Sequence, residues 1–186
     1  MKNFLLPILL LVTATVFAQK TDYPKEVTPE IAKKINAKIE NEIPALLVKL
    51  EKNNRERTDK FDEGIKFGVD TFKIERYFEE YMKVDYSTAG KESACNQAAD
   101  KYDALMNRYY KLLMAKLKPK DRPSLIAAQR SWIAFRDNES KLFDVLCKDA
   151  YSGGGTKENI AMADHYYTLV KERTLKLFEY YAGLYN

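Results

Sequence analysis

The sequence feature that most limits the fold is a long apolar stripe in the last part of the chain. Apolar or small side chains recur there at strictly alternating intervals of three and four residues. This period matches one face of an α-helix, and its length favours packing along a neighbouring helix at a shallow crossing angle. The stripe that predicts this helix consists of Ile160, Ala163, Tyr167, Val170, Thr174, Leu177, Tyr181 and Leu184.

Similar stripes predict helices along most of the remaining chain. We expect helices over about 28–50, a short one after residue 70, and longer ones over about 87–117, 121–148 and 156–184. Pro44 should kink or split the first of these, and residues 53–69 are too polar to assign. The side chains expected to cap the helices are Thr28, Asp70, Ser87, Asp121 and Thr156. The predicted fold is all-α: an antiparallel helical bundle with a helical N-terminal extension.

The first residues have the pattern of an export signal. A basic Lys2 precedes an apolar run over 4–17, and small residues before Gln19 suit cleavage after Ala18. The residue directly after the expected cut is not a cysteine, so the pattern does not predict a lipid anchor. No later apolar run is long enough to span a membrane. We expect residues 1–18 to be a cleaved signal peptide, 19–86 the helical extension, and 87–186 the bundle domain. The mature protein would then be periplasmic or secreted.

Charge and residue types argue against several classes of function. The formal net charge is only +4, and the basic residues alternate with acidic ones, as on a solvated helix face, so nucleic acid is not an expected partner. His165 is the single histidine, and the chain has no nucleophile motif, phosphate-binding loop or metal-ligand spacing. We therefore predict a protein that is not an enzyme and binds no cofactor or metal.

Two cysteines, Cys95 and Cys147, flank the proline-containing turn near residue 121 at equal distances. In an antiparallel hairpin, such residues lie at the same height. For an exported chain, this placement predicts a disulfide. A bond closing a loop of this length would stabilise the fold by about 4 kcal/mol on a chain-entropy model. The alternative is a pair of buried free thiols.

The segment over 127–137 mixes charge with apolar side chains in the middle of a predicted helix. It contains the only tryptophan, together with two arginines, a glutamine and an aspartate. Arginine forms several hydrogen bonds at once, so we interpret the segment as a polar seam between neighbouring helices. A ligand site is the alternative interpretation. The predicted polar seam comprises Asn107, Gln129, Arg130, Trp132, Arg136, Asp137 and Arg173, and Arg173 could pair with Asp137.

The run from Cys95 to Arg173 resembles the LprI-like lysozyme inhibitor family. The resemblance rests on a tyrosine-rich helix over 102–110, the Gln-Arg-x-Trp and Arg-Asp pairs over 129–137, and the glycine loop that follows. Family members commonly carry two further cysteines, and their places fall here at Ser140 and about His165. Both of these cysteines are absent here, as expected if they pair with each other in the family. We therefore expect Ser140 to lie near Asp164 or His165 across the second hairpin.

The resemblance implies a bundle fold, export and, more weakly, inhibition of lysozyme. An inhibitor would bind a protein partner such as lysozyme, and a loop joining two helices could enter its cleft. The candidate partner-binding loop comprises Gly153, Gly154, Gly155 and Lys157. The alternative function is a structural or protein-interaction module of the cell envelope. It would be marked by an exposed apolar patch on the extension, around Phe72, Phe78 and Tyr81.

Overall fold

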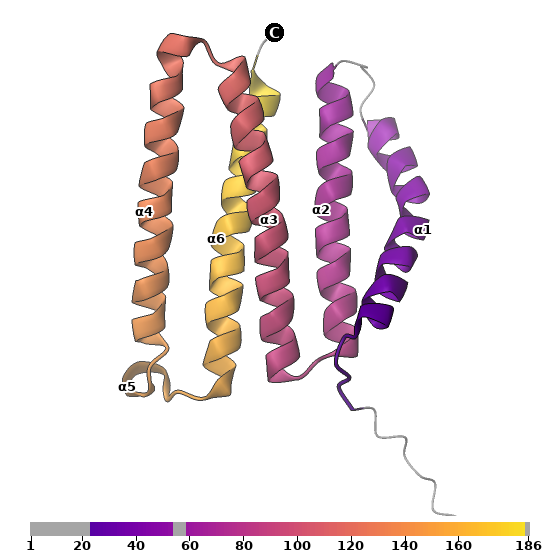
Figure 1. Ribbon diagram of the computed structural model, residues 1–186, viewed down its shortest axis with the longest axis vertical. Coiled ribbons are helices and arrows are strands. Elements are labelled where there is room, and N and C mark those ends of the chain that lie inside the picture. Colours follow the sequence, from indigo (N-terminus) through magenta and orange to yellow (C-terminus); the bar gives the residue numbers. More distant parts are fainter. Residues whose placement is uncertain (1–22, 54–58, 185–186) are drawn as a thin grey trace, which may run out of the picture.

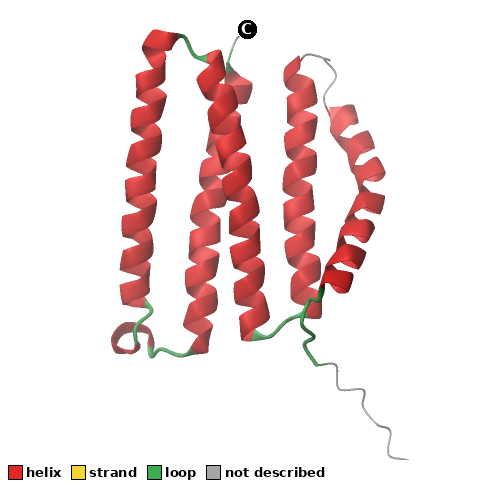
Figure 2. Ribbon diagram, viewed as in Figure 1, coloured by secondary structure: helices red, strands yellow, loops and turns green. Residues whose placement is uncertain are grey.

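The computed structural model describes residues 23–53 and 59–184, and this part of the chain is helical without strands (Figures 1 and 2). The predicted signal peptide lies outside the described residues. The helices lie roughly side by side as an all-α bundle. In chain order they are α1 (Pro29–Asn53), α2 (Asp59–Val84), α3 (Thr88–Lys116), the short 3₁₀ helix η1 (Pro119–Asp121), α4 (Arg122–Leu146), α5 (Asp149–Ser152) and α6 (Thr156–Gly183).

The helix starts confirm some of the expected caps and correct others. The Ser87 hydroxyl accepts a hydrogen bond from the Gly90 amide at 3.0 Å, and Thr28 accepts one from Ile31 at 3.4 Å, as predicted. Asp121 makes no capping bond, and Gly155 rather than Thr156 occupies the position before α6. The prediction of a short helix that begins after residue 70 is wrong, because α2 already begins at Asp59. Pro44 lies inside α1, which continues as one curved helix (Figure 1).

The main core lies between α2, α3 and α6. Tyr102 and Tyr109 of α3 and Leu177 of α6 are almost completely buried. Phe67 of α2 stacks on Phe178 of α6, with ring centroids 3.8 Å apart. Because α2 supplies core side chains to α3 and α6, the predicted extension and the bundle domain share one apolar core.

A second, smaller core joins α1 to α2 and the start of α3. Its buried residues are Ile35, Ile39, Tyr77, Tyr81 and Ala94, with Phe72 and Phe78 packed partly against them. The aromatic residues expected to form an exposed patch on the extension are therefore covered, entirely or in part, by α1 and α3. The predicted boundary at residue 86 stays a prediction.

Helix α4 packs against α6 rather than along α3 (Figure 1). Leu125 is its only buried residue. Exposed apolar side chains on α4 include Phe135, Leu142 and Leu146. The first hairpin is therefore splayed, with α6 packed closely on α3 and α4 standing to one side.

The splayed hairpin explains why the predicted disulfide is wrong: both cysteines are free thiols. Cys95 is buried on α3 near Asp164 of α6, whereas Cys147 at the end of α4 bonds Glu158 at the start of α6. Equal height along a hairpin brings two residues together only if the two helices touch on those faces. Here each cysteine contacts α6 instead.

Contacts between α4 and α6 agree with the register predicted for the second hairpin. Phe143 of α4 stacks on His165 of α6, with ring centroids 4.2 Å apart. Two turns earlier in α4, Arg136 lies over the ring of Tyr166, with its guanidinium 5.6 Å from the ring centroid. The approach of Ser140 to Asp164 or His165 stays a prediction. Within the described residues, the Ser140 hydroxyl and the His165 Nε2 are both buried without a hydrogen-bond partner.

Candidate functional site

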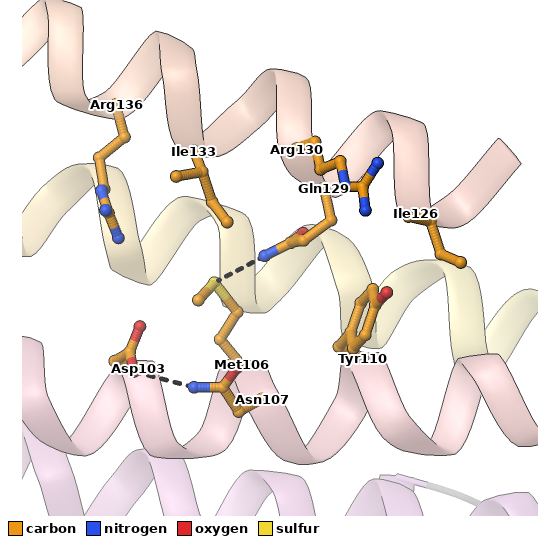
Figure 3. A pocket seen from close by; sticks show the side chains of 9 residues that line it. All are labelled: Asp103, Met106, Asn107, Tyr110, Ile126, Gln129, Arg130, Ile133 and Arg136. Atoms are coloured by element: carbon orange, nitrogen blue, oxygen red, sulfur yellow. Dashed lines mark hydrogen bonds between the residues drawn. The ribbon is translucent and has the colours of Figure 1, made fainter. Parts of the chain in front are cut away.

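An open groove of about 430 Å³ separates α3 from α4 (Figure 3). Helix α3 contributes four residues and α4 five, at intervals of one and three residues, so each wall is a single helix face. Figure 3 shows α6 behind the groove. The lining residues are Asp103, Met106, Asn107 and Tyr110 of α3, and Ile126, Gln129, Arg130, Ile133 and Arg136 of α4.

Gln129 and Arg173 form the part of the predicted polar seam that joins helices. The Arg173 Nε donates to the Gln129 Oε1 at 3.0 Å, and the Gln129 amide donates to the sulfur of Met106 at 3.7 Å. These contacts connect α6, α4 and α3. Burial lowers the pKa of Arg173. Among the described residues, nothing accepts a hydrogen bond from the buried Nη2 of this guanidinium.

Arg136 lies against aromatic rings. Its guanidinium is 5.3 Å from the centroid of Trp132 and 5.6 Å from that of Tyr166. It also forms an ion pair with the adjacent Asp137 at 2.7 Å. The expected pair between Arg173 and Asp137 is therefore wrong, because Asp137 binds its sequence neighbour and Arg173 binds Gln129.

The remaining seam residues face the groove or solvent. Asn107 is exposed and donates to Asp103 of its own helix at 2.9 Å. Arg130 is exposed, and within the described chain no hydrogen bond or ion pair involves its guanidinium. The segment over 127–137 thus has residues of both kinds. Gln129, Trp132 and Arg136 pack between helices, as a polar seam would, whereas Arg130 is exposed and unpaired among the described residues at the rim of the groove.

The glycine loop adopts backbone conformations that require glycine. All three residues have positive φ, at 80°, 63° and 106°, a region that other residues rarely adopt. At Gly154, a side chain would also collide with the Asp149 carboxylate. Lys157 of the candidate partner-binding loop is exposed and lies 3.8 Å from Glu158.

A half-buried carboxylate that the sequence did not reveal connects α2 to α3 and α6. Glu75 accepts hydrogen bonds from the hydroxyls of Tyr102 at 2.6 Å and Tyr167 at 2.9 Å, and pairs with Lys171 at 2.8 Å. Burial works to raise the pKa of Glu75, but these hydrogen bonds and the lysine charge outweigh it and lower the pKa. The partners lie 27 to 96 residues away, so no local motif signals this cluster.

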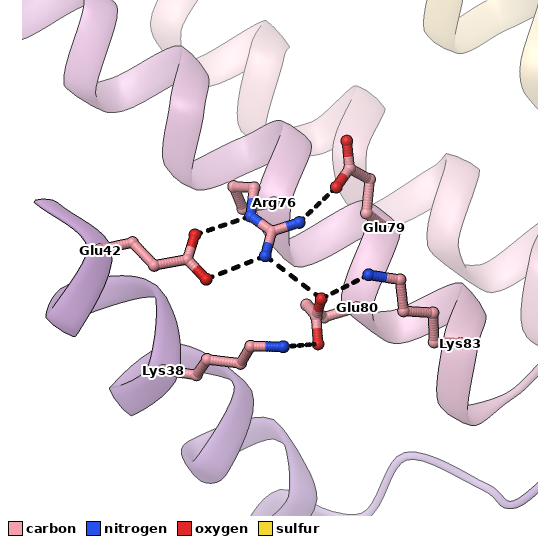
Figure 4. A network of polar contacts seen from close by, with 6 residues as sticks. All are labelled: Lys38, Glu42, Arg76, Glu79, Glu80 and Lys83. Atoms are coloured by element: carbon pink, nitrogen blue, oxygen red, sulfur yellow. Dashed lines mark hydrogen bonds and ion pairs between the residues drawn. The ribbon is translucent and has the colours of Figure 1, made fainter. Parts of the chain in front are cut away.

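A second polar cluster joins α1 to α2 (Figure 4). Arg76 binds both oxygens of Glu42 at 2.8 and 2.9 Å and also contacts Glu79 and Glu80. Glu80 in turn accepts from Lys38 and Lys83, each at 2.7 Å. The cluster alternates in charge and bridges two helices, which indicates a structural role.

The described residues lack the features of a metal site and of a membrane span. No group of three or more histidine, cysteine, aspartate or glutamate side chains there is placed to hold a metal ion. No helix in the same ranges is both long and apolar enough to cross a bilayer.

The fold and the groove define an all-α helical-bundle protein with an open cleft between two of its helices. A family model described as "Lysozyme inhibitor LprI" matches residues 82–177, just over half of the chain and nearly the whole of α3 to α6. The chain therefore belongs to the LprI lysozyme inhibitor family. No curated protein and no solved structure matches it.

Proposed function

We propose that this protein is an exported inhibitor of lysozyme-type glycosidases. Membership of the LprI family carries the proposal, because the family model spans the bundle and the groove-forming helices. The export-signal pattern before Gln19 supports a location where such enzymes act. Inhibition requires no active site in this chain, only a surface that blocks the cleft of the enzyme.

The connection between α3 and α4 supplies such a surface. Lys116, Lys118 and Lys120 are exposed there, and within the described chain none of them is paired with a carboxylate. Pro119 begins the 3₁₀ turn, and the Arg122 Nε donates to the Leu117 carbonyl at 3.2 Å, so the proline ring and this hydrogen bond both restrict the turn. Glycosidase clefts contain a pair of acidic residues. A preorganised turn with free lysines complements such a cleft.

The candidate partner-binding loop at Gly153 to Lys157 offers less charge for the same task. It contributes one lysine, and that lysine has Glu158 as a close neighbour. We therefore place the main contact with the enzyme at the α3–α4 connection and keep the glycine loop as a second contact.

A lysis assay tests the proposal. Purified protein at molar excess should slow the clearing of a cell-wall suspension by lysozyme. The double variant Lys118→Glu/Lys120→Glu should weaken this effect, whereas Lys33→Glu/Lys34→Glu, the same charge change on exposed positions of α1, should leave it intact. Undiminished lysis with the unaltered protein would remove the inhibitor function. Equal inhibition by both double variants would move the contact away from this turn.

The apolar flank of α4 favours a second candidate function, an interaction module of the cell envelope without inhibitory activity. Phe135 and Leu142 are both 52% exposed and lie two turns apart on one side of the helix. Large apolar side chains exposed on one helix face are candidates for a protein contact. If this function is correct, lysis is unaffected, and Phe135→Lys/Leu142→Lys reduces the share of the protein retained with the envelope fraction of producing cells.

A further inference from the structure

Part of the lining of the α3–α4 groove has no packing role. Asn107 and Arg130 are exposed, and Asp103 bonds only Asn107 among the described residues. Figure 3 shows Asp103 and Asn107 along the α3 wall and the Arg130 guanidinium on the α4 wall toward Tyr110, so polar groups lie along both sides of the groove. Asn107 keeps an amide oxygen and one N–H free, Asp103 keeps a second oxygen, and Arg130 keeps all its donors. Donors and acceptors along both walls of one groove suit a ligand that carries many hydroxyl groups.

The charge of the lining favours a neutral ligand. Asp103 is negative and Arg130 is positive, and the Arg136 guanidinium is already neutralised by Asp137 at 2.7 Å. The groove thus has no excess of positive charge to hold a phosphate or a carboxylate. An anionic ligand would approach the Asp103 carboxylate, and like charges repel.

Apolar side chains cover the rest of the groove. The Tyr110 ring is half-buried, and Ile126 and Ile133 lie on the facing helix (Figure 3). A sugar ring has an apolar face of C–H groups and an edge of hydroxyls, which matches this division into apolar and polar parts. The volume of about 430 Å³ lies within the range of small-molecule sites.

The walls of the groove argue against an extended peptide. Both are α-helices, whose internal backbone N–H and C=O groups are paired within the helix. An extended peptide gains much of its affinity from main-chain hydrogen bonds to an exposed strand edge, and the described part of the chain has no strand. We propose that the α3–α4 groove is a binding site for a neutral oligosaccharide, held by Asp103, Asn107 and Arg130 against Tyr110.

Trp132 provides a direct readout of binding. It is the only tryptophan in the chain, and its ring lies 5.3 Å from the guanidinium of Arg136, which lines the groove. A ligand that contacts Arg136 changes the surroundings of this ring. Tryptophan emission therefore reports a ligand that reaches Arg136, and isothermal titration calorimetry detects binding anywhere in the groove, both without a partner enzyme.

The test titrates the full chain with chitotetraose, a neutral tetramer of N-acetylglucosamine, and with maltotetraose as a second neutral oligosaccharide. Saturable emission changes are expected with at least one of them. Asn107→Ala should weaken binding by about fivefold to tenfold, the equivalent of one lost hydrogen bond. Asn96→Ala, an exposed asparagine of the same helix outside the groove, should bind as the unaltered protein does.

Several results would overturn the site. These are no binding of either oligosaccharide at millimolar concentration by emission or by calorimetry, equal weakening in Asn107→Ala and Asn96→Ala, or saturable binding of a neutral extended peptide instead. Thermal unfolding of Asn107→Ala checks its folding, and Arg130→Ala, at another exposed position, provides a second variant. Because the titration contains no lysozyme, its outcome is independent of the proposed inhibitory function.

Discussion

At the scale of single residues, Arg136 shows how a charged side chain becomes part of a helix interface. Its side chain is only 18% exposed, and its charge is balanced by Asp137 and by the faces of Trp132 and Tyr166. A guanidinium can stack on aromatic rings and form hydrogen bonds at its edge at the same time. Arg130, six residues earlier on the same helix, has neither kind of partner in the described structure. The two arginines of one motif therefore have different roles.

Replacing Arg136 by alanine should lower the unfolding temperature, since the cation–π contacts of a desolvated arginine stabilise a fold by about 1–2 kcal/mol. Arg130→Ala should leave stability nearly unchanged, because its side chain is exposed and unpaired among the described residues. Thermal unfolding followed by circular dichroism compares the two variants. Equal melting temperatures for Arg136→Ala and the unaltered protein would contradict the interface role.

The two cysteines should behave as free thiols of low reactivity. Burial is the largest of the effects that raise the pKa of Cys95 to about 11, and burial together with Glu158 also raises that of Cys147. Because the thiolate is the reactive form, the folded protein should react slowly with a thiol reagent at neutral pH. Denaturation without a reductant should then release two reactive thiols per chain. Detection of none would show a disulfide and contradict the splayed first hairpin.

At the scale of elements, α1 and α4 are attached to the bundle in different ways. Helix α1 combines a small apolar core with the ion cluster around Arg76 and Glu80 (Figure 4). Helix α4 has a single buried residue, Leu125, and three hydrogen-bonding atoms without partners lie on α4 or α6 in the described structure. Unpaired buried polar atoms weaken an interface. The groove exists because α4 is held loosely and at a distance from α3.

Acid should loosen α1 from α2. Hydrogen bonds from Lys38 and Lys83 lower the pKa of Glu80 from its ordinary 4.5 to about 2. A carboxylate whose pKa is lower in the folded state stabilises the fold at pH values above its ordinary pKa. This stabilisation is lost as the pH falls from about 4.5 toward 2. Amide hydrogen exchange in α1 should therefore speed up over this interval.

Glu80→Gln removes the titrating group, so its exchange in α1 should already be faster at neutral pH and should depend less on acid. Glu51→Gln, at an exposed position of α1 itself, is the matched control. An identical acid response in the two variants would mean that Glu80 does not govern the attachment of α1.

At the scale of the whole molecule, α2 belongs to the core of the bundle. Phe67 stacks on Phe178 and lies edge-on to Tyr109, with centroids 5.1 Å apart, while Glu75 binds Tyr102 and Tyr167. Removing α2 would expose the face of α3 and α6 that carries these aromatic rings. The family match over 82–177 therefore covers helices that depend on an additional helix for burial.

A fragment that begins at residue 87 should be much less stable than one that begins at residue 59. The longer fragment lacks only α1 and keeps the main core, whereas the shorter one loses Phe67, Ile74 and Glu75. Denaturant unfolding of the two fragments and the full chain measures the difference. If the shorter fragment unfolds as the full chain does, the predicted boundary at residue 86 marks an independent domain.

The sequence by itself determined the all-α class, most of the helix ends, and the resemblance to the LprI family. These properties depend on apolar period, capping side chains and short motifs, which are local. It did not determine which helix faces touch. The cysteine prediction failed because α6, rather than α4, packs along α3, and Glu75 was missed because its partners lie far along the chain. Only tertiary structure decided that α4 stands apart and leaves a groove beside Arg130, since side-by-side packing depends on the combined burial of three helices at once.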